Sequence, residues 1–186
     1  IYVPSREKAV FERICNLNTE GPLPDKSARA IYREIMSAAL ALESNLKIAY
    51  LGPSATFTHQ AARSKFGASV EYCPAGSIAD VFAAVENGNA DYGVVPIENS
   101  TEGAVTHTFD QFTSTTLKIC AEIYLPISLC LMASVPREKV SRVCTKQEAL
   151  GQCRRWLNDN MSGVGLESVN STTHAAELAS RSDCAA

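Results

Sequence analysis

The sequence of 186 residues contains no apolar run long enough to cross a membrane, which takes roughly 20 residues for a helix. Its start also lacks the charged, apolar and small-residue regions of a signal peptide. Neither sign of charge is in large excess, because 17 Lys and Arg residues are interspersed with 20 Asp and Glu residues, for a net charge of −3. With no basic stripe and no acidic tail, the sequence predicts no binding to nucleic acid or to a membrane.

Metal-site, disulfide and dinucleotide patterns are also missing. The sequence has no GxGxxG, so dinucleotide binding is not supported, and His59, His107 and His174 have no ligand-like spacing with cysteine. Seven cysteines are an odd number, and none form a CxxC pair. Buried reduced thiols are therefore the better interpretation, which favours a reducing compartment, most simply the cytosol. Five of them lie within apolar or helical patterns: Cys73, Cys120, Cys130, Cys144 and Cys153.

What the sequence does contain changes character near residue 45. Residues 1–44 predict two helices, from Pro4 to about Leu17 and from a cap at Asp25 onward, with apolar stripes that need a partner from other sequence or another subunit. Residues 45–186 alternate between strand and helix patterns, so we expect an α/β domain with a mostly parallel sheet. The expected strands are 47–51, 70–73, 92–97, 140–144, 165–169 and a long one at 117–132, bent at Leu125-Pro126; the expected helices end at 66, 87, 112, 157 and 179.

Polar residues follow the apolar run Tyr92–Ile97 at once. Open α/β sheets bind ligands just past the C-terminal ends of their strands, so Glu98, Asn99 and Ser100 are candidate ligand contacts. The alternative is a plain strand-to-helix connection with Ser100 or Thr101 as the helix cap, and the pattern alone favours neither. Glu98 also fits a structural carboxylate bonded to backbone amides.

Two further strand-to-helix connections carry polar residues. Backbone N–H groups in the turn Gly52–Thr58 can hold a carboxylate at the helix start, although Thr56 or Thr58 also fits a simple cap. Thr145 and Gln152 are seven residues apart on an expected helix. By themselves they read as a cap and a solvated side chain.

Four segments resemble the prephenate dehydratase family. Pro96–Gly103 resembles its substrate loop, Tyr50–Ala62 its first strand-turn-helix, Thr145–Cys153 its Ser-to-Gln helix motif and Ser171–Ala176 its Ser-Thr-x-x-Ala-Ala turn. Together they cover about residues 46–186. The resemblance implies two α/β lobes with a cleft between them, similar to the type 2 fold of periplasmic binding proteins. Departures are Ala55 where members often carry Gly, and Lys146 and Glu148 where His and Gln are common.

The resemblance implies a set of site residues, with no metal and no organic cofactor. Catalytic roles fall to Asn99, Thr145 and Gln152. Substrate-binding roles fall to Thr56, Phe57, Thr58, Glu98, Ser100, Thr101, Ser171 and Thr172. The family's main catalytic threonine, in a Thr-Arg-Phe motif, and its regulatory phenylalanine-binding domain are expected beyond Ala186, so we expect these 186 residues alone to be nearly inactive.

Residues 1–44 resemble the last two helices of an all-α chorismate mutase, through Val3–Glu7, Gly21–Pro24 and Tyr32–Glu43. Arg6 and Glu7 match its active-site pair, and Glu43 its Gln/Glu position, whereas Ala39 replaces its usual Ser. The long first helix of that domain is missing. The chain thus resembles an internal piece of a bifunctional chorismate mutase–prephenate dehydratase, which implies a homodimer in the full-length enzyme.

The implied function is the conversion of prephenate to phenylpyruvate, a carbon–oxygen lyase reaction of L-phenylalanine biosynthesis, with chorismate as the substrate of the mutase part. The alternatives are an arogenate dehydratase, or a non-enzymatic two-lobed domain that binds a small molecule. The sequence does not decide between prephenate and arogenate, nor does it show regulation by phenylalanine.

Overall fold

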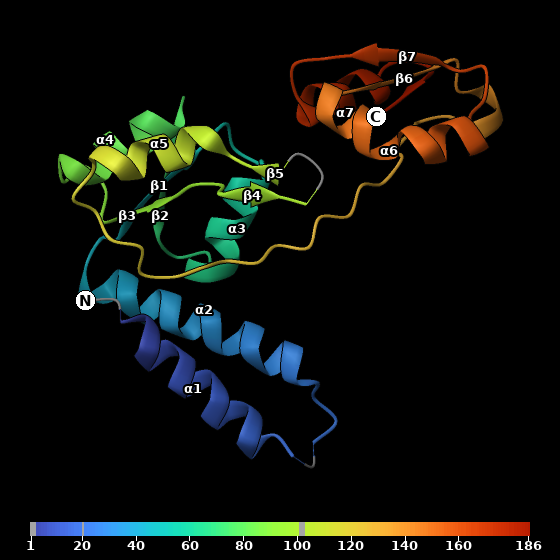
Figure 1. Cartoon of the computed structure of the whole chain (residues 1–186). Coiled ribbons are helices and arrows are strands. Elements are labelled where there is room, and N and C mark those ends of the chain that lie inside the picture. The colour runs from blue at the N-terminus through green and yellow to red at the C-terminus, as the bar shows by residue number, and fades with distance from the viewer. Residues whose placement is uncertain (1–2, 20, 101–102) are drawn as a thin grey trace. The chain divides into compact units, whose positions relative to one another are not determined.

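The computed structural model describes residues 3–19, 21–100 and 103–186. These residues form two compact units, which divide between Leu125 and Pro126. Each unit has its own sheet, and Figure 1 shows the elements of both. The expected mixed α/β class is confirmed. Within the described ranges, no helix combines the length and hydrophobicity that a membrane span requires.

The first unit begins with a helical hairpin of α1 (Pro4–Leu17) and α2 (Asp25–Glu43), as the apolar stripes predict. Asp25 is the first residue of α2 rather than its cap, which is Pro24. The carboxylate of Asp25 instead accepts a hydrogen bond of 2.8 Å from the amide of Asn18, which also donates to the Leu23 carbonyl at 2.8 Å. Asn18 thereby closes the loop between the two helices.

The hairpin approaches the rest of the first unit most closely at Gly67. Gly67 has φ +78°, and a Cβ there would lie 2.5 Å from the Cβ of Ser37, which is 1% exposed. The Ser37 hydroxyl accepts a hydrogen bond from the Ser69 amide at 3.1 Å, and Glu34 accepts one from the Ala68 amide at 2.9 Å. Only glycine allows α2 to approach residues 67–69 so closely.

Part of the apolar stripe of α2 stays uncovered, as its pattern predicts. Ile31, Ile35 and Leu42 are 51%, 55% and 91% exposed. Leu40 of the same helix packs against the core of the sheet domain. One face of α2 therefore packs against the rest of the first unit, while the face with Ile31, Ile35 and Leu42 is exposed.

The sheet of the first unit is parallel, with strand order β2-β1-β3. Its strands are β1 (Lys47–Leu51), β2 (Glu71–Ala75) and β3 (Tyr92–Val94). In β1, Ile48 and Tyr50 pack toward α3 (Phe57–Phe66), whereas Ala49 packs toward α4 (Ile78–Glu86). Helices thus cover both faces of the central strand, as parallel sheets require.

After β3 the chain differs from the prediction in two ways. The strand ends at Val94 rather than Ile97, since Pro96 has no N–H to donate to a ladder. The helix expected from Glu102 begins at Thr106, because β4 (Glu98–Asn99) and β5 (Gly103–Ala104) form a short antiparallel pair before α5 (Thr106–Ser114). Glu102 itself lies outside the described residues.

The long strand predicted at 117–132 is wrong. Among the described residues, 115–131 have no regular secondary structure and join no strand ladder, and Met132 exchanges backbone hydrogen bonds with Ala186, at 3.0 and 2.8 Å. The segment has the alternating apolar residues of a strand, yet Ile119 and Tyr124 are 71% and 91% exposed. A strand needs a neighbouring strand to satisfy its backbone groups, and none of the described residues provides one here.

The second unit contains a parallel sheet of order β7-β6-β8, with β6 (Arg142–Thr145), β7 (Gly165–Ser168) and β8 (Cys184–Ala185). A 3₁₀ turn, η1 (Arg137–Lys139), precedes it. Its helices are α6 (Gln147–Asn160) and α7 (Thr172–Ala179), near their predicted bounds. Val143, Leu157 and Met161 form one core, and Cys144, Ala179 and Cys184 form another.

All seven cysteines are free, but they are not all buried as the pattern suggests. Cys120 and Cys130 are exposed, because the segment that carries them does not pair as a strand. Cys144 and Cys184 are buried, and burial, followed by the hydrogen bond with Cys184, raises the pKa of the Cys144 thiol to about 11.

We predict that alkylation of the native chain by iodoacetamide at pH 8 modifies Cys120 and Cys130 first, because only an accessible thiolate reacts. Cys144 and Cys184 should react only after unfolding in guanidinium chloride. Peptide mass spectrometry over a time course measures each site. Native labelling of Cys144 at the rate of Cys120 would contradict the packing of the second unit.

Candidate active site

The turn after β1 is fixed by Thr56, the N-cap of α3. Its hydroxyl accepts a hydrogen bond from the His59 amide at 3.3 Å and donates one to the Leu51 carbonyl at 3.1 Å. Of the two threonines proposed for this cap, Thr56 is therefore the N-cap residue. Its only proton is committed to the end of β1, which leaves the hydroxyl an acceptor toward any ligand.

Several backbone amides in the same turn have no acceptor. Within the described part of the chain, the N–H groups of Ser54, Phe57 and Thr58 donate no hydrogen bond, whereas that of Ala55 donates to His59 Nδ1 at 3.0 Å and that of Thr56 closes the turn over Ser54 and Ala55. They lie at the N-terminus of α3, where the helix dipole adds partial positive charge. Phe57 is 42% exposed and Thr58 is half-buried. This arrangement suits a carboxylate.

Ala55 adopts an unusual backbone conformation in this turn. Its φ is +66°, the only positive φ at a non-glycine residue in the described ranges. That is the left-handed region in which glycine is favoured, so the family's usual Gly at this position has a physical reason. The change to Ala in this chain is a source of local strain.

The loop after β3 presents the second set of predicted residues. Glu98 and Ser100 are exposed, Asn99 is half-buried opposite Gly103 in the β4–β5 pair, and Thr101 lies outside the described residues. Because β1 and β3 are parallel neighbours, this loop and the turn Gly52–Thr58 both leave the same edge of the sheet. The two polar groups therefore lie at the same end of the parallel strands.

Thr108, which the sequence pattern did not single out, anchors this loop. It is fully buried, and its hydroxyl donates a hydrogen bond of 2.6 Å to the Pro96 carbonyl. The Val105 amide donates to the Ile97 carbonyl at 2.9 Å. A threonine in the first turn of a helix that follows a proline-containing loop is the signal that points to such an anchor.

In the second unit, polar residues again follow parallel strands. Thr145 is the last residue of β6, opposite Ser168 of β7, rather than the cap of α6, which is Lys146. Gln152 is half-buried on α6. Ser171 caps α7 by accepting a hydrogen bond of 3.0 Å from the His174 amide, and Thr172 is exposed.

Lys146 and Glu148, which depart from the family pattern, bond to each other at the start of α6. Their side chains lie 3.1 Å apart. The backbone N–H of Glu148, followed by Lys146, lowers the pKa of the Glu148 carboxyl. The carboxylate therefore occupies the N-terminus of α6, in the place where a ligand anion binds at other helices.

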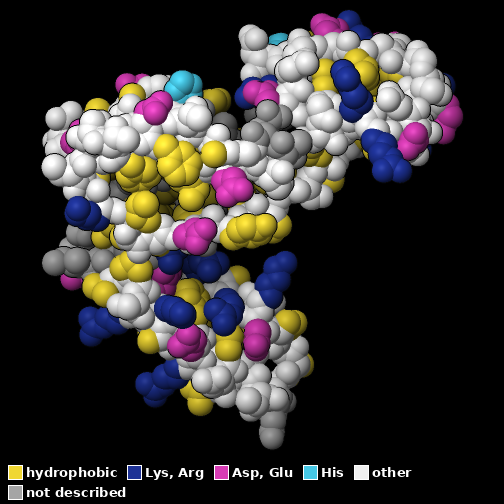
Figure 2. Space-filling model, viewed as in Figure 1, with side chains coloured by type: hydrophobic (Ala, Val, Ile, Leu, Met, Phe, Trp, Pro, Cys, Tyr) yellow, Lys and Arg dark blue, Asp and Glu magenta, His cyan; other side chains and the backbone are white. Residues whose placement is uncertain are grey.

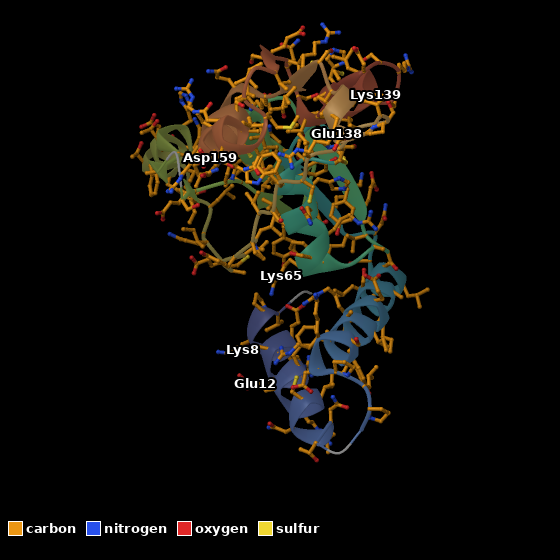
Figure 3. All side chains as sticks on the ribbon, turned by 90° about the vertical axis from the view of Figure 1, so that its right-hand side faces the viewer. Lys8, Glu12, Lys65, Glu138, Lys139 and Asp159 are labelled. Carbon is orange, nitrogen blue, oxygen red and sulfur yellow. The ribbon has the colours of Figure 1, made fainter. Side chains whose placement is uncertain are left out.

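The mutase-like residues lie at the hairpin. Arg6 is exposed in α1, and Glu43 is exposed at the end of α2. Glu7 forms an ion pair of 2.7 Å with Lys65, which Figure 3 labels on the side of α3 toward the hairpin. Glu7 also lines a hollow of about 470 Å³ with Phe11, Arg29 and Arg33, and Figure 2 shows basic side chains gathered on this part of the surface. The guanidinium carbons of Arg29 and Arg33 lie 5.7 and 5.3 Å from the Phe11 ring centre.

No group of three or more His, Cys, Asp or Glu residues among the described residues is arranged to hold a metal ion. The predicted residues thus fall into two sets of amide, hydroxyl and backbone N–H groups, one in each unit. Such groups hold carboxylates and hydroxyls and transfer protons to or from oxygen.

We predict that Ala55→Gly stabilises the first unit by about 0.5–1 kcal/mol. Relief of the left-handed strain, about 1–2 kcal/mol, exceeds the added entropy of the unfolded chain. Ala83→Gly, at an exposed position inside α4, is the control and should instead lower the free energy of unfolding by about 0.5–1 kcal/mol. Urea denaturation measures both; a loss of stability in both variants would show that Ala55 is not strained.

Comparison with known proteins agrees with this geometry. A family model described as prephenate dehydratase matches residues 48–186, and one described as chorismate mutase type II matches residues 1–44. The bifunctional chorismate mutase/prephenate dehydratase of Aquifex aeolicus is 50% identical over 183 residues, which cover 96% of this chain and 51% of that protein. The protein of the same name from Pseudomonas aeruginosa is 42% identical over 178 residues, 95% of this chain and 48% of that one.

Among solved structures, the prephenate dehydratase of Arthrobacter aurescens in complex with L-Phe aligns with a TM-score of 0.65 at 30% identity, over 75% of this chain and 47% of that chain. This chain spans about half the length of the curated relatives named above. The family match covers the turn and helix after β1, the loop after β3 and both polar groups of the second unit. On the basis of this match, the chain belongs to the prephenate dehydratase family.

Proposed function

We propose that residues 48–186 supply the substrate-holding groups of a prephenate dehydratase. The observation that carries the proposal is the turn after β1, with three backbone amides that have no acceptor among the described residues, at a helix N-terminus. The loop with Asn99 leaves the same sheet edge, since β1 and β3 are neighbours. Prephenate has two carboxylates and a ring hydroxyl, and donors of this kind fit both.

The reaction requires the protein to position the substrate and to supply one proton. Prephenate loses its hydroxyl as water and a carboxylate as carbon dioxide, which gives phenylpyruvate and an aromatic ring. The two electrons of the breaking C–C bond enter the ring as the C–O bond breaks, so no oxidant or reductant is needed. Aromatisation provides the driving force. The protein must hold the dianion and protonate the leaving oxygen.

We assign these tasks as follows. The amides of Ser54, Phe57 and Thr58 hold one carboxylate, with Thr56, Glu98, Ser100 and Thr101 as neighbouring contacts. Asn99 binds a hydroxyl or a carboxylate with its amide. In the second unit, Thr145, Gln152, Ser171 and Thr172 contact the substrate. The downstream Thr-Arg-Phe motif expected from the family supplies the main catalytic threonine.

We predict that Asn99→Ala and Gln152→Ala each lower kcat/KM roughly tenfold to a hundredfold, in a protein extended through that motif. Each variant loses a hydrogen bond to a charged group, about 1.5–3 kcal/mol. Asn158→Ala, an exposed amide on the same helix as Gln152, is the control and should match the wild type. Phenylpyruvate formation is measured with prephenate, and phenylalanine formation with arogenate.

Activity within twofold of wild type in both variants would remove Asn99 and Gln152 from the site. A wild-type preference for arogenate would correct the substrate while leaving the reaction class in place. Absence of either product from the extended wild-type protein would overturn the proposed function.

For residues 1–44 we propose the closing part of a chorismate mutase pocket, with Arg6, Glu7 and Glu43 facing chorismate in the full-length protein. We also propose that a second copy of the chain covers Ile31, Ile35 and Leu42, and that the homodimer works in the cytosol, where the seven free cysteines remain reduced.

We predict that the full-length protein has the mass of a dimer by light scattering, and that Ile35→Glu shifts it toward the monomer, because a charge at this position opposes burial of the stripe. Glu43→Gln, which changes the charge on α2 outside this stripe, is the control. A monomeric wild-type protein at micromolar concentration would contradict the dimer.

A further inference from the structure

His59 has more contacts with the turn after β1 than a residue on a helix surface needs. Its Nδ1 accepts the hydrogen bond from the Ala55 amide at 3.0 Å, and its own amide donates to Thr56 Oγ1. Its ring stacks on Tyr50, with ring centres 4.6 Å apart and planes at 11°, and meets the edge of Tyr72 at 5.4 Å. The ring is thus held on three sides, and its acceptor is directed at the turn.

The Tyr50 side chain makes a second connection to the same turn. Tyr50 is 1% exposed in β1, and its hydroxyl lies 3.1 Å from the Ser54 hydroxyl. Ser54 and Ala55 are therefore bonded to a stack of two rings that rests on the sheet. The strained Ala55, with φ +66°, keeps its conformation because its amide has this fixed acceptor.

The acceptor role of Nδ1 sets the protonation state of the ring. In neutral imidazole one nitrogen accepts and the other carries the proton, so the proton lies on Nε2. The charged and titratable groups around the ring are Tyr50 from β1, Tyr72 from β2 and Arg63 on its own helix. Burial, followed by Arg63, lowers the pKa of His59, which keeps the ring neutral at pH 7.

We infer that His59 is a positioning residue of the dehydratase: by holding the Ala55 amide, it directs the neighbouring N–H groups of Ser54, Phe57 and Thr58 toward a substrate carboxylate. The inference rests on the proposed function. His59 itself makes no contact with substrate. Its loss should weaken the binding of a dianion and leave the chemical step nearly unchanged.

The pH dependence follows from the direction of the pKa. An imidazolium has no acceptor, so the bond to Ala55 is lost as pH falls through the folded-state pKa of His59, below 6.5. Above that pKa the contact is present and KM is at its lowest. We expect KM for prephenate to rise at acid pH while kcat changes less.

Three variants of the extended protein test this inference. His59→Phe keeps the stacking and removes the acceptor, so KM should rise about tenfold with kcat within twofold. His59→Asn places an oxygen near the position of Nδ1 and should restore KM, without the acid rise. His107→Phe, an exposed histidine on α5, is the control and should behave as the wild type.

A readout independent of activity accompanies the kinetics. The ¹⁵N–¹H shift of the Ala55 amide should titrate with His59 in the wild type and become insensitive to pH over this range in His59→Asn. This measurement needs no folded Phe variant. If the extended wild type makes no product, the proposed function fails, while the amide titration still tests the contact.

Two results would overturn the inference. If the wild type is active and a folded His59→Phe protein has an unchanged KM, the turn keeps its conformation without the hydrogen bond to His59. A KM that falls at acid pH in the wild type and not in His59→Asn would make the imidazolium a direct contact of the substrate.

Discussion

The burial of β1 on both faces is the constraint on which the first unit depends. Ile48 is fully buried toward α3 and Ala49 is 1% exposed toward α4, so the strand has no freedom to shift its register. Its C-terminal end therefore places the turn Gly52–Thr58 at a fixed point. β3, hydrogen-bonded beside it, places the loop with Asn99 at the same edge. The candidate site inherits its geometry from apolar packing.

Sequence reasoning succeeded where local pattern and tertiary structure agree. The strand Lys47–Leu51 and the start of the helix at Pro4 were predicted to the residue, and the helix end was predicted at about Leu17, because apolar periodicity and terminal residues such as Pro4 report on local structure. It failed for residues 117–132, whose alternation is strand-like, because pairing depends on a neighbour that a local pattern does not contain. For the same reason Cys120 and Cys130 were expected to be buried and are exposed.

The candidate site shows the same division. The positions of its residues along the chain follow from the order of strands and turns that the sequence predicts. The roles of His59 and Thr108 depend on contacts with the Ala55 amide and the Pro96 carbonyl, which folding alone brings within reach. The same N-cap interaction occurs in both units. The hydroxyls of Thr56 and Ser171 each accept a hydrogen bond from the backbone amide of the histidine three residues later. Only the first of these histidines is packed between aromatic rings; His174 faces Glu177 at 3.8 Å.

The contact between Ser37 and Gly67 gives the hairpin a thermodynamic role. Because the Ser37 hydroxyl accepts the Ser69 amide just before β2, the Ser69 hydrogen bond breaks whenever α2 separates from the sheet domain. Opening of the hairpin therefore also exposes the residues at the C-terminal end of α3, the helix that begins at the turn after β1. The contact therefore links the packing of α2 to the end of α3, so we expect a change that weakens the hairpin to lower the stability of this end of the helix as well.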